Sequence, residues 1–117
     1  MQPLRSVLMA LAERPDVAGV VVVSDDGLVV EASLPAALDA EELAALATSA
    51  ARSVSGLSDA AQTGPWAQAA VESSHGALVV QRLPSGGILL VLAAPDGDLG
   101  TLLYDLRRHA PALVSLL

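Results

Sequence analysis

The feature that most constrains the fold is a run of β-branched aliphatic residues that ends in a turn sequence. Residues 18–24 read AGVVVVS, Asp25-Asp26-Gly27 follows, and residues 28–33 continue as LVVEAS. Asp-Gly tolerates the positive φ that tight hairpin turns need, so the pattern predicts a β-hairpin. Because the first strand is apolar at successive positions, both of its faces must be covered. The hairpin therefore predicts a sheet with this strand near its centre and packing layers on both sides.

Two helices flank the hairpin in the sequence. The first is predicted over about residues 3–14, where apolar residues recur at helical spacing and Pro15 ends the pattern. The second is predicted from about residue 40 to 57 or a little beyond. Asp39 stands at its N-cap and Glu42 lies three residues later, which is the spacing of a capping box.

The second half of the chain predicts a meander of strands and a last helix. Residues 66–73, 77–83 and 88–94 read as three strands separated by glycine-containing turns. Asp98 is the predicted cap of a helix that Pro111 should kink or interrupt. The order α-β-β-α-β-β-β-α predicts one α/β domain over residues 1–117, with a five-stranded antiparallel sheet flanked by helices.

Composition excludes several classes of function. The chain has 117 residues, no cysteine and a net charge of −7, and all six of its cations are arginine. Disulfides and thiolate metal sites are therefore excluded, and nucleic acid or an anionic membrane is an unfavourable partner. Apolar runs reach only about seven residues, against the roughly 20 that span a bilayer. Since no cationic segment precedes an apolar run at the N-terminus, we expect no signal peptide and a cytoplasmic protein.

No pattern of residues predicts catalysis, a cofactor or a metal site. The acidic pairs at positions 25–26 and 96–98 fall where turns and helix caps are needed, and neither continues into a calcium loop. His75 and His109 are predicted on a turn and a helix, and adjacency to Ser74 does not make His75 a catalytic base. Neither phosphate-binding glycine motifs nor a G-x-S-x-G elbow occurs. We therefore expect no enzymatic activity.

Helix 40–57 carries the most suggestive surface. Ala44, Ala47 and Ala51, with Thr48 beside them, form a face of small side chains. Such a face would let a second helix approach closely, so it is a candidate interface. Alanine is also simply a good helix former, and the same face would lie flat on the domain's own sheet. The sequence leaves both interpretations open.

Two segments together resemble the roadblock (dynein light chain) domain family. They are VAGVVVVSDDGLVVEAS at 17–33 and GGILLVLAAPDGDLGTLLYDLRR at 86–108, separated by the long Ala/Leu/Ser helix and the meander. The similarity covers nearly the whole chain and is greatest to stand-alone bacterial members, including MglB-type regulators of a gliding-motility GTPase. The resemblance implies a three-layer α/β/α, profilin-like domain. Because these motifs belong to the fold, they carry over no catalytic residue.

The resemblance also implies a homodimer in which the third strands pair and the second helices lie side by side. It further implies a small Ras-like GTPase as partner, bound on the face of the paired helices. The expected interface residues are Ala44, Ala47, Thr48, Ala51, Arg52, Trp66, Gln68, Ala70 and Glu72.

Arginine could act on such a GTPase as a catalytic finger. Arg107 and Arg108 are candidates, but cations are also favourable near a helix C-terminus, and this second interpretation is preferred. Arg52 is the only arginine on the second helix, and we expect the last helix on the opposite face of the sheet. We therefore predict regulation without a catalytic arginine.

An alternative function is a small-molecule sensor with a profilin-like or PAS-like pocket. Such pockets are normally lined by aromatic side chains or convergent polar groups. Trp66 and Tyr104 are the only aromatic residues of the chain, which argues against a sensor. A hydrolase of unknown type is the weakest alternative.

Overall fold

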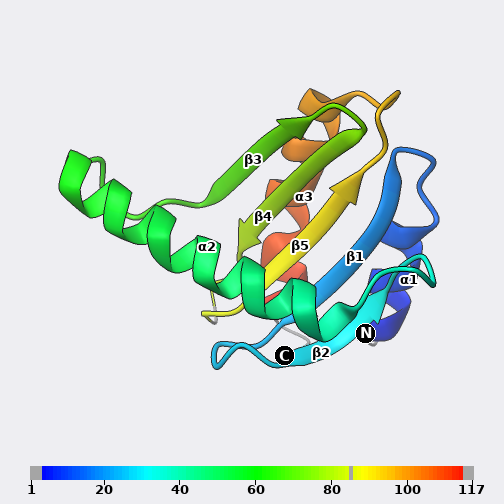
Figure 1. Ribbon diagram of the computed structural model, residues 1–117, viewed down its shortest axis with the longest axis horizontal. Helices are drawn as coiled ribbons and strands as arrows, with labels where there is room; N and C mark the ends of the chain where they lie inside the picture. The colour runs from blue at the N-terminus through cyan, green and yellow to red at the C-terminus, as the bar shows by residue number, and fades with distance from the viewer. Residues whose placement is uncertain (1–3, 85, 115–117) are drawn as a thin grey trace.

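The computed structural model describes residues 4–84 and 86–114 as three helices and five strands. In chain order they are α1 (Leu4–Ala12), β1 (Val17–Val23), β2 (Val29–Ser33), α2 (Ala40–Ala61), β3 (Gln68–Ser73), β4 (Gly76–Arg82), β5 (Ile88–Ala93) and α3 (Leu99–Val114). The strands form one antiparallel sheet in the order β2-β1-β5-β4-β3. Helix α2 crosses one face, while α1 and α3 cover the other (Figure 1). The predicted α/β/α fold and its element order are confirmed.

Strand β1 lies inside the sheet, as its sequence predicts. It pairs with β2 on one side and β5 on the other, and Val20 to Val23 have no exposed surface. Val20 and Val22 pack toward α1 and α3, whereas Val21 and Val23 pack toward α2. The unbroken valine run is therefore explained by burial on two faces, each face taking alternate side chains.

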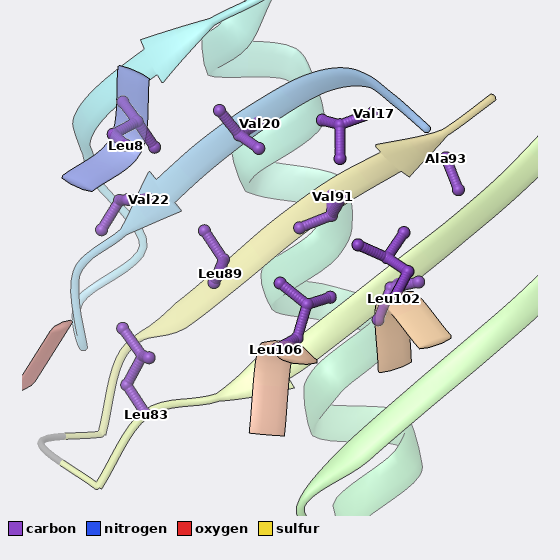
Figure 2. Close-up of a cluster of buried hydrophobic side chains, with 11 residues drawn as sticks. Leu8, Val17, Val20, Val22, Leu83, Leu89, Val91, Ala93, Leu102 and Leu106 are labelled. Atoms are coloured by element: carbon purple, nitrogen blue, oxygen red, sulfur yellow. The ribbon is translucent and has the colours of Figure 1, made fainter. Parts of the chain in front are cut away.

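The larger of the two cores lies between the sheet and the pair α1 and α3. Figure 2 shows Leu8 of α1 and Leu102 and Leu106 of α3 pointing toward Leu89 and other side chains of the sheet. The apolar side chains of this layer are all aliphatic, which agrees with the absence of phenylalanine from the chain.

The predicted turn and caps are present. Gly27 has a φ of 85° in the β1–β2 turn, and the Ser24 N–H donates to Leu28 O at 2.8 Å. Asp39 Oδ1 accepts from the N–H groups of Glu41 and Glu42 at 2.9 and 3.3 Å. At the start of α3, Asp98 Oδ1 accepts from the Thr101 N–H at 3.2 Å, and its other oxygen accepts from the Thr101 hydroxyl.

Two predictions about the helices differ from the structure, and one helix end becomes defined. Helix α1 ends at Ala12 and not at residue 14, and its predicted start at residue 3 lies outside the described residues. Helix α2 ends at Ala61, a little beyond residue 57 as predicted, where Gln62 takes a left-handed φ of 58°. Helix α3 runs uninterrupted through Pro111 to Val114, so the proline does not end it.

Candidate interaction surface

Helix α2 covers only part of its face of the sheet. It packs on β1, β2 and β5, where Ala44 and Ala47 contact a cluster that includes Val21 and Leu90. Its C-terminal half then extends beyond the sheet, on the side where β3 and β4 lie (Figure 1). The β3–β4 part of this face is therefore not capped by a helix of the described chain.

An apolar groove of about 280 Å³ lies between α2 and the β3–β4 part of the sheet. Its lining is almost entirely hydrocarbon and comes from α2, from the segment just before β3 and from the strands β3, β4 and β5. The lining residues are Leu43, Leu46, Ala47, Ala50, Ala51, Val54, Trp66, Ala69, Val71, Leu78, Val80 and Leu90.

Four large apolar side chains on or near this groove are exposed. Leu46 and Leu57 of α2 are 61% and 69% exposed, and Val71 and Leu78 of the sheet are 56% and 41% exposed. We call these four residues together with the groove the α2–β3 surface. Contiguous exposed apolar surface of this kind marks an interaction site in soluble proteins.

Strand β3 adds an open hydrogen-bonding edge to the α2–β3 surface. It is the last strand in the sheet order and pairs only with β4 among the described strands. The pairing runs from Gln68 to Ser73 without a register shift, and the strand contains no proline. Bulges, prolines and charges are the usual protection of an edge strand, and Glu72 is the only charge that β3 carries. This edge is therefore suited to pairing with another strand.

The two faces of β3 belong to different layers. Ala69 and Val71 line the groove on the α2 side. The Gln68 side chain turns to the other layer, where its Nε2 donates to Gln81 Oε1 at 2.7 Å and to Leu103 O at 2.9 Å. By strand alternation Ala70 and Glu72 share the face of Gln68. Of the expected interface residues in this region, only Trp66 lines the groove.

The small-residue face of α2 lies on the protein's own sheet. Ala44 and Ala47 are 1% and 6% exposed, and Ala51 is half-buried against the same core. The interpretation of this face as a contact with a second helix is therefore corrected for Ala44 and Ala47. Small side chains are needed here because the long helix packs close to the strands.

Thr48 and Arg52 lie on a different flank of α2, away from the groove. The Thr48 hydroxyl donates to Ala44 O at 2.8 Å, which keeps it within its own helix. Both residues line a smaller hollow near the β1–β2 turn.

A second apolar stripe of α2 was not among the expected interface residues. Leu43, Leu46, Ala50, Val54 and Leu57 follow one another at intervals of three or four residues, which is the helical period. This periodicity was visible in the sequence. The expected interface residues of α2 came instead from the neighbouring face, where alanine recurs at helical spacing.

The charged candidates are used by the fold. A hollow of about 260 Å³ at another end of the sheet includes Asp16, Glu72 and Asp98 in its lining. Asp16 forms an ion pair with Arg14. Asp98 caps α3, and the hydrogen bonds that it accepts from Thr101 lower its pKa below the ordinary value. Within residues 4–84 and 86–114, no three histidine, aspartate or glutamate side chains gather as a metal site would require.

Both histidines lie on the surface of the protein. Ser74 Oγ and His75 Nδ1 lie 3.0 Å apart, but both residues are exposed on the β3–β4 turn, where they line an open hollow. His109 is likewise exposed on α3. Among the described helices, none combines the length and apolar character that crossing a membrane requires.

Comparison with known proteins agrees with this architecture. A family model described as the Roadblock/LC7 domain matches residues 5–93. The uncharacterized protein MJ0310 of Methanocaldococcus jannaschii is 30% identical over 111 residues, which cover 94% of this chain and 96% of that protein. A solved Roadblock/LC7 domain from Streptomyces avermitilis is 30% identical, with a TM-score of 0.74 over 97% of this chain and 93% of that one.

A further solved structure shares the fold at lower identity. MglB of Myxococcus xanthus superposes with a TM-score of 0.88 over 97% of this chain and 86% of that chain, at 17% sequence identity. At this identity the likeness concerns the fold.

Proposed function

This chain belongs to the Roadblock/LC7 domain family, and we propose that it is a cytoplasmic homodimeric interaction module that regulates or scaffolds a small Ras-like GTPase. The observation that carries the proposal is the α2–β3 surface, where exposed leucine and valine side chains lie beside an open strand edge. The carboxylates of Asp39 and Asp98 cap helices and that of Asp16 pairs with Arg14, so a binding role needs no further function from them.

A second copy of the chain is the best occupant of the α2–β3 surface. Antiparallel pairing of β3 with its symmetry mate would satisfy the edge hydrogen bonds of both protomers and join the two sheets. The same two-fold axis would bring the two α2 helices together over the grooves. A two-fold interface places the same surface of each protomer against the other, so the apolar α2–β3 surface of one protomer would face that of its partner.

The energetics favour association in this arrangement. Each protomer would bury Leu46, Leu57, Val71 and Leu78, which contribute roughly 0.8–1.5 kcal/mol apiece when half their surface is removed from water. The sum from two protomers is comparable with the roughly 4–15 kcal/mol that association costs in lost freedom. Backbone hydrogen bonds between the two β3 strands would add to the free energy of association and favour the dimer.

The GTPase partner is proposed from family membership and from the MglB-like fold, which are warrants by analogy. Pairing of the α2 helices would create a continuous outer face from two protomers, and we assign the GTPase to this face. Arg107 and Arg108 belong to α3, on the other side of the sheet from α2. The module would therefore act by shifting the populations of the GTPase switch loops, without adding an arginine to the transition state.

The proposal is tested by capture from native extract. The immobilised protein is incubated with extract supplemented with GDP or a non-hydrolysable GTP analogue, and bound proteins are identified by mass spectrometry. We expect one Ras-like GTPase to be enriched in a nucleotide-dependent manner. A matched column carrying Leu46→Asp and Leu57→Asp in α2 should lose that GTPase, because the paired-helix face no longer forms. Enrichment of no GTPase in either nucleotide state contradicts the proposed partner.

A further inference from the structure

A second hollow, of about 160 Å³, lies under α2 at the end of the sheet that carries the β1–β2 and β4–β5 turns. Arg52 and Ser55 of α2 line it from one side, and Trp66 and Arg82 line it from the sheet. The β4–β5 turn contributes Gly86, where a Cβ atom would lie 2.8 Å from the carboxylate of Asp25. Glycine at this position therefore keeps the hollow open.

Arg82 is held in place by contacts that leave most of its guanidinium free. The Trp66 indole N–H donates to Ser55 Oγ at 2.8 Å, which fixes the ring against α2. The Arg82 guanidinium lies 5.3 Å from the centre of that ring, and its Nη1 donates to Trp66 O at 3.2 Å. Stacking and one hydrogen bond thus fix the guanidinium before any ligand arrives.

Arginine side chains outnumber carboxylates among the residues that line this hollow. In the part of the chain that the structure describes, Arg5 and Arg14 pair with carboxylates, whereas Arg52 and Arg82 do not. Asp25 lines the same hollow but lies beyond ion-pair distance from both arginines. Among the side chains that line the hollow, two guanidiniums and one carboxylate leave one net positive charge, within a chain of net charge −7.

We propose that this hollow binds a carboxylate side chain presented by an acidic segment of a partner protein. The planar fork of Arg82 matches a carboxylate, and the Ser55 hydroxyl can donate alongside it. Ile88 gives the hollow an apolar wall for the methylene groups of a glutamate. Its volume suits one side chain and is below the roughly 300 Å³ at which pockets begin to hold whole small-molecule ligands.

The single net positive charge favours a carboxylate over a phosphate. A phosphate carries up to two negative charges near neutral pH and would meet Asp25 at the rim of the hollow. The site is complete within one protomer. It therefore does not depend on the identity of the GTPase, although Trp66 and Ala51 also line the groove of the α2–β3 surface.

Trp66 makes the site directly observable, because it is the only tryptophan of the chain. The indole N–H signal of the full-length protein is followed by NMR during titration with a capped acidic peptide, Ac-Glu-Asp-Glu-Glu-NH₂. Its uncharged counterpart, Ac-Gln-Asn-Gln-Gln-NH₂, and inorganic phosphate are titrated separately at constant ionic strength. We expect saturable shifts with the acidic peptide and several-fold weaker responses to the other two probes.

Substitutions then locate the binding. Arg82→Gln should weaken peptide binding about tenfold, which is the loss expected for one charge-assisted hydrogen-bonded pair. Arg52→Gln should weaken it by a smaller factor, and because Arg52 is exposed this variant also tests the site if Arg82→Gln fails to fold. The matched control Arg107→Gln/Arg108→Gln removes two charges elsewhere and should bind within about twofold of wild type.

Three results would overturn the proposal. The first is the absence of an indole shift with the acidic peptide. The second is phosphate binding as tight as that of the peptide, which would make the hollow a site for free phosphate. The third is equal loss of binding in the control variant, which would show that only the overall charge matters.

Discussion

Arg14 Nη1 donates to Asp105 Oδ2 at 2.9 Å and so connects the segment between α1 and β1 to α3. The same guanidinium donates through Nε and Nη2 to both carboxylate oxygens of Asp16, at 2.9 and 2.8 Å. These hydrogen bonds hold the pKa of Asp16 below its ordinary value. One arginine therefore connects α3 to the residues just before β1.

Replacing Arg14 should destabilise the fold more than replacing another paired arginine. Arg14→Ala leaves two partly buried carboxylates without their partner, so we expect a loss of about 1–2 kcal/mol in the free energy of unfolding. Arg5→Ala is the matched control, because the Arg5 side chain of the Arg5–Glu31 pair is 72% exposed, and it should cost less than about 0.5 kcal/mol. Urea unfolding at fixed protein concentration measures both. Equal losses would show that the Arg14 cluster contributes no more than a surface pair.

Stability should decline in acid because two carboxylates have lowered pKa values in the folded state. Hydrogen bonds from Arg14 lower the pKa of Asp16, and those from Thr101 lower that of Asp98. Below the unfolded-state pKa of about 4, the unfolded chain binds protons that the folded chain does not, so stability falls as the pH falls. Thermal unfolding between about pH 6 and 3 should show this decline, and it should be shallower in Arg14→Ala. A midpoint that is constant, or that rises on acidification, would contradict this assignment.

Arginine scanning of α2 should separate its buried and exposed faces. Ala47→Arg places a charge in the core and should unfold the domain. Ala50→Arg acts on an exposed residue of the groove and should leave a folded monomer, because the charge opposes its symmetry mate. Ala45→Arg, exposed on the side away from the groove, should alter neither folding nor association. Circular dichroism reports folding and sedimentation velocity reports association. A folded dimer of Ala47→Arg would mean that this face does not lie on the sheet.

Much of the fold follows from local patterns in the sequence. The valine run predicted a central strand because burial on two faces removes the usual alternation, and the residues from Val20 to Val23 are fully buried. Asp39 and Asp98 marked two helix starts because unpaired N–H groups need acceptors there. Each of these features depends on residues that are close together in the sequence, so it can be predicted from the sequence alone.

Features that depend on distant residues were not predictable. Arg14 and Asp105 are 91 residues apart, and nothing in either neighbourhood indicates the other. Two apolar faces share α2, and only the position of the sheet decides that Ala44 and Ala47 are buried while Leu46 and Leu57 stay exposed. The stacking of Arg82 on Trp66 likewise depends on where β4 places its last residue.

GTP hydrolysis by the partner should be insensitive to the arginines of this chain. Single-turnover rates are compared for the GTPase with wild type, with Arg52→Ala and with Arg107→Ala/Arg108→Ala. An arginine finger is worth about 10³–10⁵ in rate, so we expect changes below about tenfold in both variants. A loss of finger size in either variant, with binding intact, would show that this chain supplies a catalytic arginine.

The most direct test of the account is the molar mass of the protein in solution. Light scattering at micromolar concentration should give about twice the chain mass of 11.8 kDa. Val71→Asp places a charge on the exposed, groove-facing side of β3 and should give the mass of one chain with unchanged circular dichroism. A monomeric wild type, or a Val71→Asp variant that dimerises as tightly as wild type, would contradict assembly through the α2–β3 surface.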